Sequence, residues 1–162
     1  MIAYKRIYIC GFTASGKSTL AAKLSKKYSL PVFVTDNFTY SDATYTIYRT
    51  ETQRATLLKK TATTENWIIE GVHRKEWIDP GFKRAEIIVI LWPSWCRLFY
   101  QTVNRYFAQG KPTTFSRLLK FIWWMIKGQK RFITAYISLA QKYNKKYFVL
   151  RSRRNVSQFV YQ

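Results

Sequence analysis

A glycine-rich segment with a lysine and two hydroxyl residues follows the first apolar run of the chain. It reads Gly11-Phe-Thr-Ala-Ser-Gly-Lys-Ser-Thr19 and matches the pattern G-x-x-x-x-G-K-[ST] completely. Such a turn points its backbone N–H groups at an anion, and a helix that begins at the lysine adds the positive end of its dipole. Lys17 can reach the β- and γ-phosphates, and Ser18 can offer its hydroxyl to Mg²⁺. The segment therefore predicts a P-loop that binds ATP with magnesium. The loop residues expected at the nucleotide are Gly11, Thr13, Ala14, Ser15, Gly16, Lys17, Ser18 and Thr19.

Two carboxylates lie where they could act beside the bound phosphates. Asp36 follows the apolar segment 31–35, and Glu70 ends the apolar segment 67–70 directly before a glycine. Acids at the carboxyl ends of parallel strands border the ligand crevice of α/β folds. Both are therefore candidates for catalysis, and with Ser18 they form the predicted magnesium site. The alternatives are that Asp36 caps a helix or turn and that Glu70 pairs with a neighbouring cation.

The charge of the chain indicates an acidic partner. There are 28 Lys and Arg against 8 Asp and Glu, which gives a net charge of +20. Such a balance suits phosphorylated small molecules, nucleic acid or an anionic membrane surface. Arg74, Arg97 and Arg105 are candidates for stabilising a transferred phosphoryl group, whose charge spreads over its equatorial oxygens. The alternative is that each is a solvated surface charge.

The elements that must position these residues alternate between strand-like and helical patterns. Apolar strands are expected at 4–10, 31–35, 67–70, 85–91 and 146–151, and helices at 17–28, 47–61, 94–107, 115–143 and 155–161. This alternation predicts an α/β three-layer sandwich, with a five-stranded, mainly parallel sheet and helices on both faces. Without an internal repeat or linker, 162 residues form one domain, 1–162.

Three local features complete the prediction. Gly110-Lys-Pro112 breaks the helical pattern just after Arg105, so a lid-like segment is expected at about 106–117, and the long helix that follows is expected to be interrupted at Gly128. The single histidine, His73, has no partner at metal-ligand spacing and is interpreted as a loop residue.

The two cysteines and the apolar segments indicate where the protein resides. Cys10 and Cys96 lie far apart in sequence, which favours a reducing, cytoplasmic setting. The most apolar segment, 118–126, is broken by a lysine and is much shorter than the ~20 residues that span a bilayer, so no transmembrane segment is expected.

With these motifs the chain resembles the nucleoside monophosphate kinase group of P-loop proteins. Within that group it resembles the adenylate-kinase-related family of DNA topology modulation proteins (FlaR-like). The matching stretches are the P-loop, Thr35-Asp-Asn-Phe38, Trp67-Ile-Ile-Glu-Gly71 with Arg74, Leu91-Trp-Pro-Ser-Trp95 with Arg105, and Leu150-Arg-Ser-Arg-Arg-Asn-Val-Ser-Gln-Phe159. The resemblance implies that segment 70–74 holds the metal shell and the acceptor phosphate. It also implies that arginines near the lid grip the phosphoryl group and that the loop with Arg153 touches the nucleobase.

Two departures from that family concern the metal site. The family usually has Asp-Gly where this chain has Glu70-Gly71, and it has an acid on the fourth strand where this chain reads Ile90-Leu-Trp-Pro93. No carboxylate side chain follows Glu86. The metal shell therefore falls to Ser18 with Asp36 or Glu70.

Two functions follow from these patterns. The first is a phosphotransferase that resembles adenylate kinase and moves the γ-phosphoryl group of ATP to a small nucleotide or hydroxylated acceptor over residues 36–60. The second is a nucleotide-binding regulatory protein that binds DNA or RNA through residues 82–162, which hold 16 basic side chains and 1 acidic one. A hybrid, with the 5′ end of a polynucleotide as the acceptor, combines the two.

Overall fold

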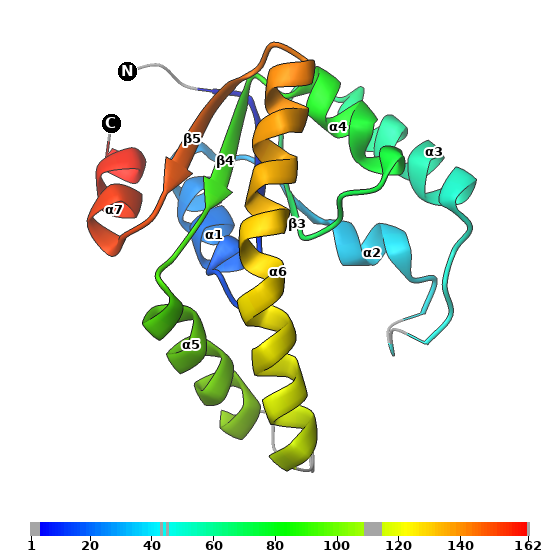
Figure 1. The fold of residues 1–162 in the computed structure, drawn as a ribbon. Helices are drawn as coiled ribbons and strands as arrows, with labels where there is room; N and C mark the ends of the chain where they lie inside the picture. The colour runs from blue at the N-terminus through cyan, green and yellow to red at the C-terminus, as the bar shows by residue number, and fades with distance from the viewer. Residues whose placement is uncertain (1–3, 43, 45, 109–114, 162) are drawn as a thin grey trace.

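The computed structural model describes residues 4–42, 44, 46–108 and 115–161 (Figure 1). In chain order the elements are β1 (Arg6–Gly11), α1 (Lys17–Tyr28), β2 (Val32–Val34), α2 (Thr35–Thr39), α3 (Glu51–Ala62), β3 (Trp67–Gly71), the 3₁₀ helix η1 (Glu76–Ile78), α4 (Asp79–Arg84), β4 (Ile87–Leu91), α5 (Trp95–Ala108), α6 (Phe115–Lys142), β5 (Lys146–Leu150) and α7 (Arg153–Tyr161).

The five strands form one sheet in the order β2-β3-β1-β4-β5, and every pair is parallel. The central strands β1, β3 and β4 are buried along nearly their whole length, as apolar strands covered on both faces must be. The predicted α/β fold with a five-stranded parallel sheet is therefore confirmed.

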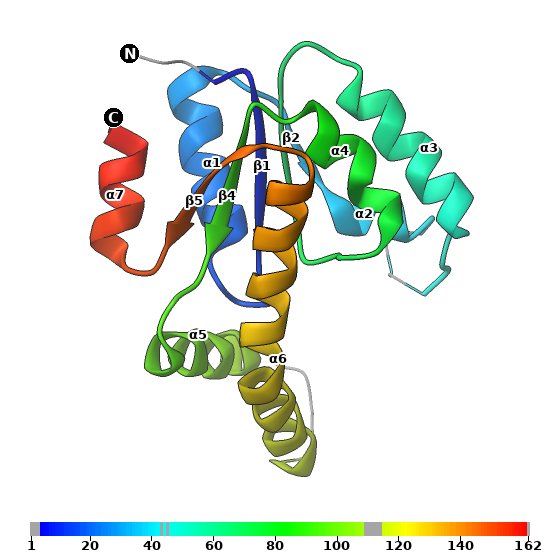
Figure 2. The same ribbon diagram turned by 45° about the horizontal axis from the view of Figure 1, so that its top comes forward.

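Helices cover the two faces of the sheet and make three layers (Figure 2). Alternate residues of β1 point to opposite faces, so Ile7 and Ile9 pack with side chains of α1 and α7. Tyr8 and Cys10 pack on the other face, where side chains of α3, α4 and α6 gather around Trp67. The core is thus split by the sheet, and both halves stabilise the same central strands.

Parallel pairing brings the carboxyl ends of the strands to one edge of the sheet. The registers there pair Val34 with Glu70, Cys10 with Gly71, Gly11 with Leu91, and Leu91 with Leu150. Helix α5 and the first part of α6 extend beyond this edge (Figure 1). The predicted lid-like segment at 106–117 includes residues 109–114, which lie outside the described part of the chain.

The structure departs from the expected elements at four places. α2 and the pair η1–α4 were not predicted, and α3 begins later than expected because Thr50 caps it: its side chain accepts from the N–H of Gln53, and the Gln53 side chain accepts from the N–H of Thr50. The expected interruption at Gly128 is wrong, since α6 continues through it. A Cβ at Gly128 would lie 3.2 Å from the ring of Phe12, so the glycine lets α6 approach the P-loop closely.

Within the described residues, no helix combines the length and the apolarity needed to cross a bilayer.

Candidate functional site

The P-loop connects β1 to α1 in a conformation suited to an anion. Gly16 has φ 93° and Ala14 has φ 58°, so the loop turns through two left-handed positions. Gly16 also precedes α1 as its N-cap, and no side chain caps the helix there. The N–H groups of the first helical turn therefore lack an intrahelical acceptor and suit phosphate oxygens.

Lys17 and Phe12 link this loop to the helices beyond it. The Lys17 ammonium donates a hydrogen bond to the Phe12 carbonyl at 3.0 Å. The Phe12 side chain is buried beside Leu98 of α5 and Phe132 of α6, with a ring-centroid distance of 5.0 Å to Phe132 and an edge-to-face geometry. The position of the loop is thus fixed from the side of α5 and α6.

Ser18 and Glu70 come together across the edge of the sheet. The Ser18 hydroxyl donates to a Glu70 carboxylate oxygen at 2.7 Å, although 52 residues separate them in sequence. Glu70 is only 3% exposed, so its carboxylate is held in place at the end of β3. Two of the three predicted magnesium ligands are therefore neighbours.

Gly71 determines how closely the next layer of the site can approach. A Cβ at this position would lie 1.7 Å from the Thr35 hydroxyl oxygen, so only glycine allows the start of α2 to pack there. Asp36 follows directly, in the first turn of α2, where its negative charge suits the helix dipole. The same packing brings Asp36 to the edge of the sheet where Glu70 lies.

Asp36 pairs with a residue that the sequence analysis interpreted as an ordinary loop histidine. His73 Nε2 lies 3.1 Å from Asp36 Oδ1 and 3.1 Å from the Thr39 hydroxyl oxygen. The His73 side chain is 24% exposed and that of Asp36 is 49% exposed. The only sequence signal was the position of the single histidine, three residues after Glu70.

Whether this site can hold magnesium depends on the Ser18, Asp36 and Glu70 side chains. Among the described residues, no three His, Cys, Asp or Glu side chains gather into a metal-binding cluster. Mg²⁺ commonly binds through one or two carboxylates together with substrate phosphates and water. The Ser18 hydroxyl and the Glu70 carboxylate beside the phosphate loop fit that kind of site.

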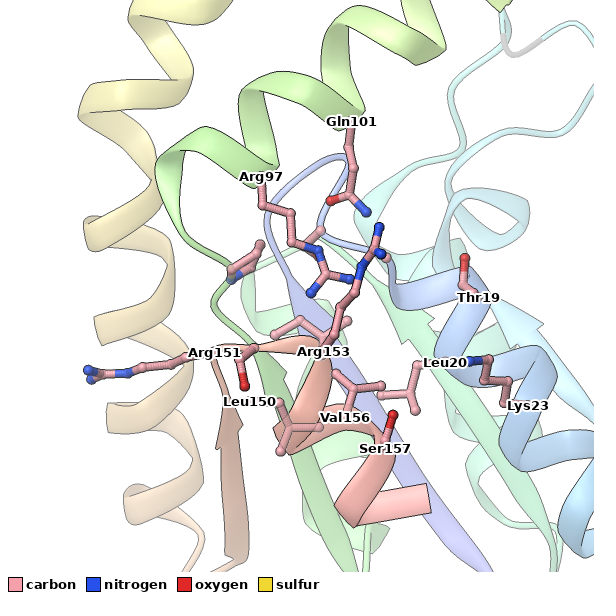
Figure 3. Close-up of a pocket in the computed structure, with 15 residues that line it drawn as sticks. Thr19, Leu20, Lys23, Arg97, Gln101, Leu150, Arg151, Arg153, Val156 and Ser157 are labelled. Atoms are coloured by element: carbon pink, nitrogen blue, oxygen red, sulfur yellow. The ribbon is translucent and has the colours of Figure 1, made fainter. Parts of the chain in front are cut away.

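A cavity of about 370 Å³ lies next to the P-loop, between α1, α5 and the turn from β5 to α7. Its apolar walls include Leu20, Leu150 and Val156. Figure 3 shows the side chains of Arg97 and Arg153 pointing toward one another at its mouth. Burial and the charge of Arg153 lower the pKa of Arg97 below its ordinary value. The cavity therefore joins an apolar wall to two cations, which suits a nucleoside that carries phosphates.

The other predicted arginines are placed differently. The Arg74 guanidinium lies 3.7 Å from the centre of the Phe132 ring, a cation–π contact. Arg151 points away from the cavity, with its guanidinium 4.5 Å from the centre of a Trp92 ring. Arg105 is on α5, but its side chain lies outside the described part of the chain. The structure thus brings Arg97 and Arg153 together, and Arg74 does not join them.

Fold and site together define an α/β P-loop fold like that of nucleoside monophosphate kinases. Comparison with solved structures agrees with this fold. Shikimate kinase from Bacteroides thetaiotaomicron has a TM-score of 0.62, with 18% identity over 98% of this chain and 95% of that chain. Shikimate kinase from Acinetobacter baumannii, in complex with shikimate, has a TM-score of 0.60, with 12% identity over 97% and 89%. A sugar kinase from Janibacter sp. HTCC2649 has a TM-score of 0.57, with 17% identity over 97% and 90%.

No family model and no curated protein sequence matches the chain. At 12–18% identity the structural likeness shows the shared fold. The resemblance to DNA topology modulation proteins stays a prediction.

Proposed function

We propose that this protein is an ATP-dependent phosphotransferase that moves the γ-phosphoryl group to a small acceptor. The observation that carries the proposal is the 2.7 Å hydrogen bond between Ser18 and the buried Glu70. It sets a hydroxyl and a carboxylate beside the P-loop, as a magnesium–triphosphate complex requires.

The nucleotide would lie across the P-loop, with its nucleoside in the 370 Å³ cavity. Leu20, Leu150 and Val156 offer apolar surface to the base, and Arg97 and Arg153 offer cations at the mouth. The triphosphate would receive the N–H groups at the start of α1 and the Lys17 ammonium.

Ser18 would bind magnesium directly, and Glu70 would bind it directly or through water, with Asp36 as the further candidate. Bound there, the ion would neutralise charge on the β- and γ-phosphates. The side chains have the complementary task of fixing the triphosphate. Because Glu70 is buried and hydrogen-bonded to Ser18, its carboxylate would need little rearrangement to hold the ion beside the triphosphate.

In the transfer step an acceptor oxygen forms a bond to the γ-phosphorus while the bond to the ADP oxygen breaks. Lys17 donates to the phosphoryl oxygens as charge develops on them. Asp36, at the acceptor side of the edge, takes the proton that a hydroxyl acceptor loses. Arg105 and Arg97 are the candidates that would stabilise the transferring group from the side of α5.

The test is ATP consumption with Mg²⁺, with and without a panel of nucleoside monophosphates and small alcohols, in the wild type and in Lys17→Ala. We expect acceptor-dependent ADP formation that falls at least about 100-fold in the variant, because charge stabilisation in the transition state is lost. Lys26→Ala, a matched change at an exposed lysine of the same helix, should leave turnover unchanged. Turnover that survives Lys17→Ala in a folded protein would contradict the proposal.

A further inference from the structure

The hydrogen bonds around His73 determine which of its ring nitrogens carries the hydrogen. The Thr39 hydroxyl donates its single proton to the Thr35 carbonyl at 3.0 Å. Toward His73 Nε2, 3.1 Å away, the same oxygen can therefore only accept. The Asp36 carboxylate on the other side of Nε2 is also an acceptor. His73 Nε2 must therefore be the protonated nitrogen.

The other ring nitrogen is left with a lone pair. In a neutral imidazole, a hydrogen on Nε2 makes Nδ1 an acceptor. Among the described residues, none forms a hydrogen bond to Nδ1, and the side chain remains 24% exposed. The ring is also held from one side by Trp77, at a centroid distance of 5.0 Å. His73 is thus a fixed, accessible hydrogen-bond acceptor three residues beyond Glu70.

Three arginines lie on this side of the site, and each has a contact within the protein; the Arg54 guanidinium lies 5.7 Å from the centre of the Tyr48 ring. Arg49 Nη1 donates to the carbonyls of Asn37 and Phe38, at 2.8 and 3.4 Å, and to that of Tyr40. Arg74 lies on the Phe132 ring. An acceptor that carries a phosphate group would need such cations to bind that phosphate. Arg74 is the residue that the family resemblance assigned to the acceptor phosphate. An uncharged hydroxyl, in contrast, needs an acceptor atom for its proton.

We propose that His73 Nδ1 receives the hydrogen bond of an acceptor hydroxyl and orients its oxygen for attack, so that the substrate is an alcohol and not a nucleoside monophosphate. This inference rests on the phosphotransferase activity proposed above. Asp36 and Thr39 hold the imidazole in the required tautomer and orientation, while the triphosphate is bound at the P-loop. As the acceptor oxygen bonds to the γ-phosphorus, its single proton passes along this hydrogen bond to His73 Nδ1, in place of a direct transfer to Asp36. The Asp36 carboxylate, which accepts from Nε2–H, then stabilises the positive charge on the ring.

Two substitutions separate the two ring nitrogens. In His73→Gln the side-chain amide can reach the place of Nε2 and donate to Asp36, but nothing replaces Nδ1. In His73→Asn the amide oxygen can take the place of Nδ1, but the contact with Asp36 is lost. The measurements are kcat and KM for ribose, glucose, shikimate, adenosine and thymidine, and for AMP, GMP, CMP and UMP, together with ATP binding by calorimetry.

We expect turnover with one or more of the alcohols and not with the monophosphates. His73→Gln should lower kcat/KM for the alcohol about tenfold or more, with ATP binding unchanged, because one hydrogen bond to the substrate is lost. His73→Asn should retain more activity than His73→Gln, whereas a purely structural histidine would show the reverse order.

The inference and the function on which it rests fail in different ways. Monophosphates as the preferred acceptors, or wild-type kcat/KM in His73→Gln, would overturn the role of His73 and leave the phosphotransferase standing. A wild-type protein that turns over ATP with none of the probes would overturn both.

Discussion

At the scale of single residues, the site depends on how Glu70 and Gly71 end β3. Glu70 is buried and bonded to Ser18, so it can act on a metal only if the strand end stays where it is. Gly71 allows this because the Thr35 side chain occupies the space that a Cβ would need. The glycine therefore supports both the Ser18–Glu70 hydrogen bond and the start of the helix that carries Asp36.

We expect Gly71→Ala to lower the free energy of unfolding by about 2 kcal/mol, because the added methyl overlaps Thr35. The measurement is urea unfolding followed by circular dichroism. The double variant Gly71→Ala with Thr35→Ala should recover part of the loss, since it removes the two outer atoms of the clash. A single variant as stable as the wild type would contradict this account of the strand end.

At the scale of elements, α6 is positioned against the P-loop through Gly128. The helix runs unbroken from Phe115 to Lys142, and its Gly128 lies against the Phe12 ring. Phe132, one turn further, meets the same ring edge-to-face and carries Arg74 on its surface. The long helix thus contacts both the phosphate loop and the acceptor side.

We expect Gly128→Val to displace Phe12 and to weaken ATP binding about tenfold, because overpacking here forces the P-loop to shift. Isothermal titration calorimetry measures the effect. Ser138→Val, a β-branched substitution at an exposed position of the same helix, is the matched control and should bind ATP normally. Equal affinities in both variants would show that the contact does not fix the loop.

The strands and the P-loop could be predicted from the sequence because both are local signals. The strands are short apolar runs, and the loop is a fixed spacing of residue types. The helices α2 and η1–α4 could not be predicted, since they are only a few residues long and tertiary packing decides them. Gly128 was misread for a related reason: its neighbour is a phenylalanine more than 100 residues away.

The site was only partly predictable for the same reason. Ser18 was predicted to share a magnesium site with Asp36 or Glu70, and the structure places the Ser18 and Glu70 side chains in hydrogen-bond contact. The pairing of Asp36 with His73 depends on how α2 packs against the loop after β3, which no spacing in the sequence encodes. Arg74 was a candidate by position, but its contact with Phe132 depends on α6.

At the scale of the whole molecule, the two halves of the chain contribute differently charged side chains to the site, with Lys17 as a cation from the first half. The carboxylates at the edge come from the first half, and Arg97 and Arg153 come from the second. The net charge of +20 also attracts polyanions in general, and counterion release makes such attraction steeply dependent on salt. General attraction must therefore be separated from a built nucleic-acid site.

We expect duplex DNA to bind at low salt and to lose at least about 100-fold in affinity between about 50 and about 200 mM salt. Fluorescence anisotropy with a labelled duplex measures this. Reversing the exposed pair Lys59 and Lys60 on α3 to Glu should weaken binding as much as reversing Lys130 and Arg131 on α6. Binding that survives at the higher salt and responds only to the α6 pair would favour the regulatory function.

Phe12 has a consequence for the order of events during a reaction cycle. Its carbonyl accepts from the Lys17 ammonium, and its ring lies between Leu98 of α5 and Phe132 of α6. A triphosphate that takes over the ammonium removes the Lys17 donor from that carbonyl, which keeps its hydrogen bond from the Ser15 N–H at 3.2 Å. Nucleotide binding therefore changes the partners of a residue whose side chain packs with both α5 and α6. Through this one residue, nucleotide binding at the P-loop would alter the packing of α5 and α6.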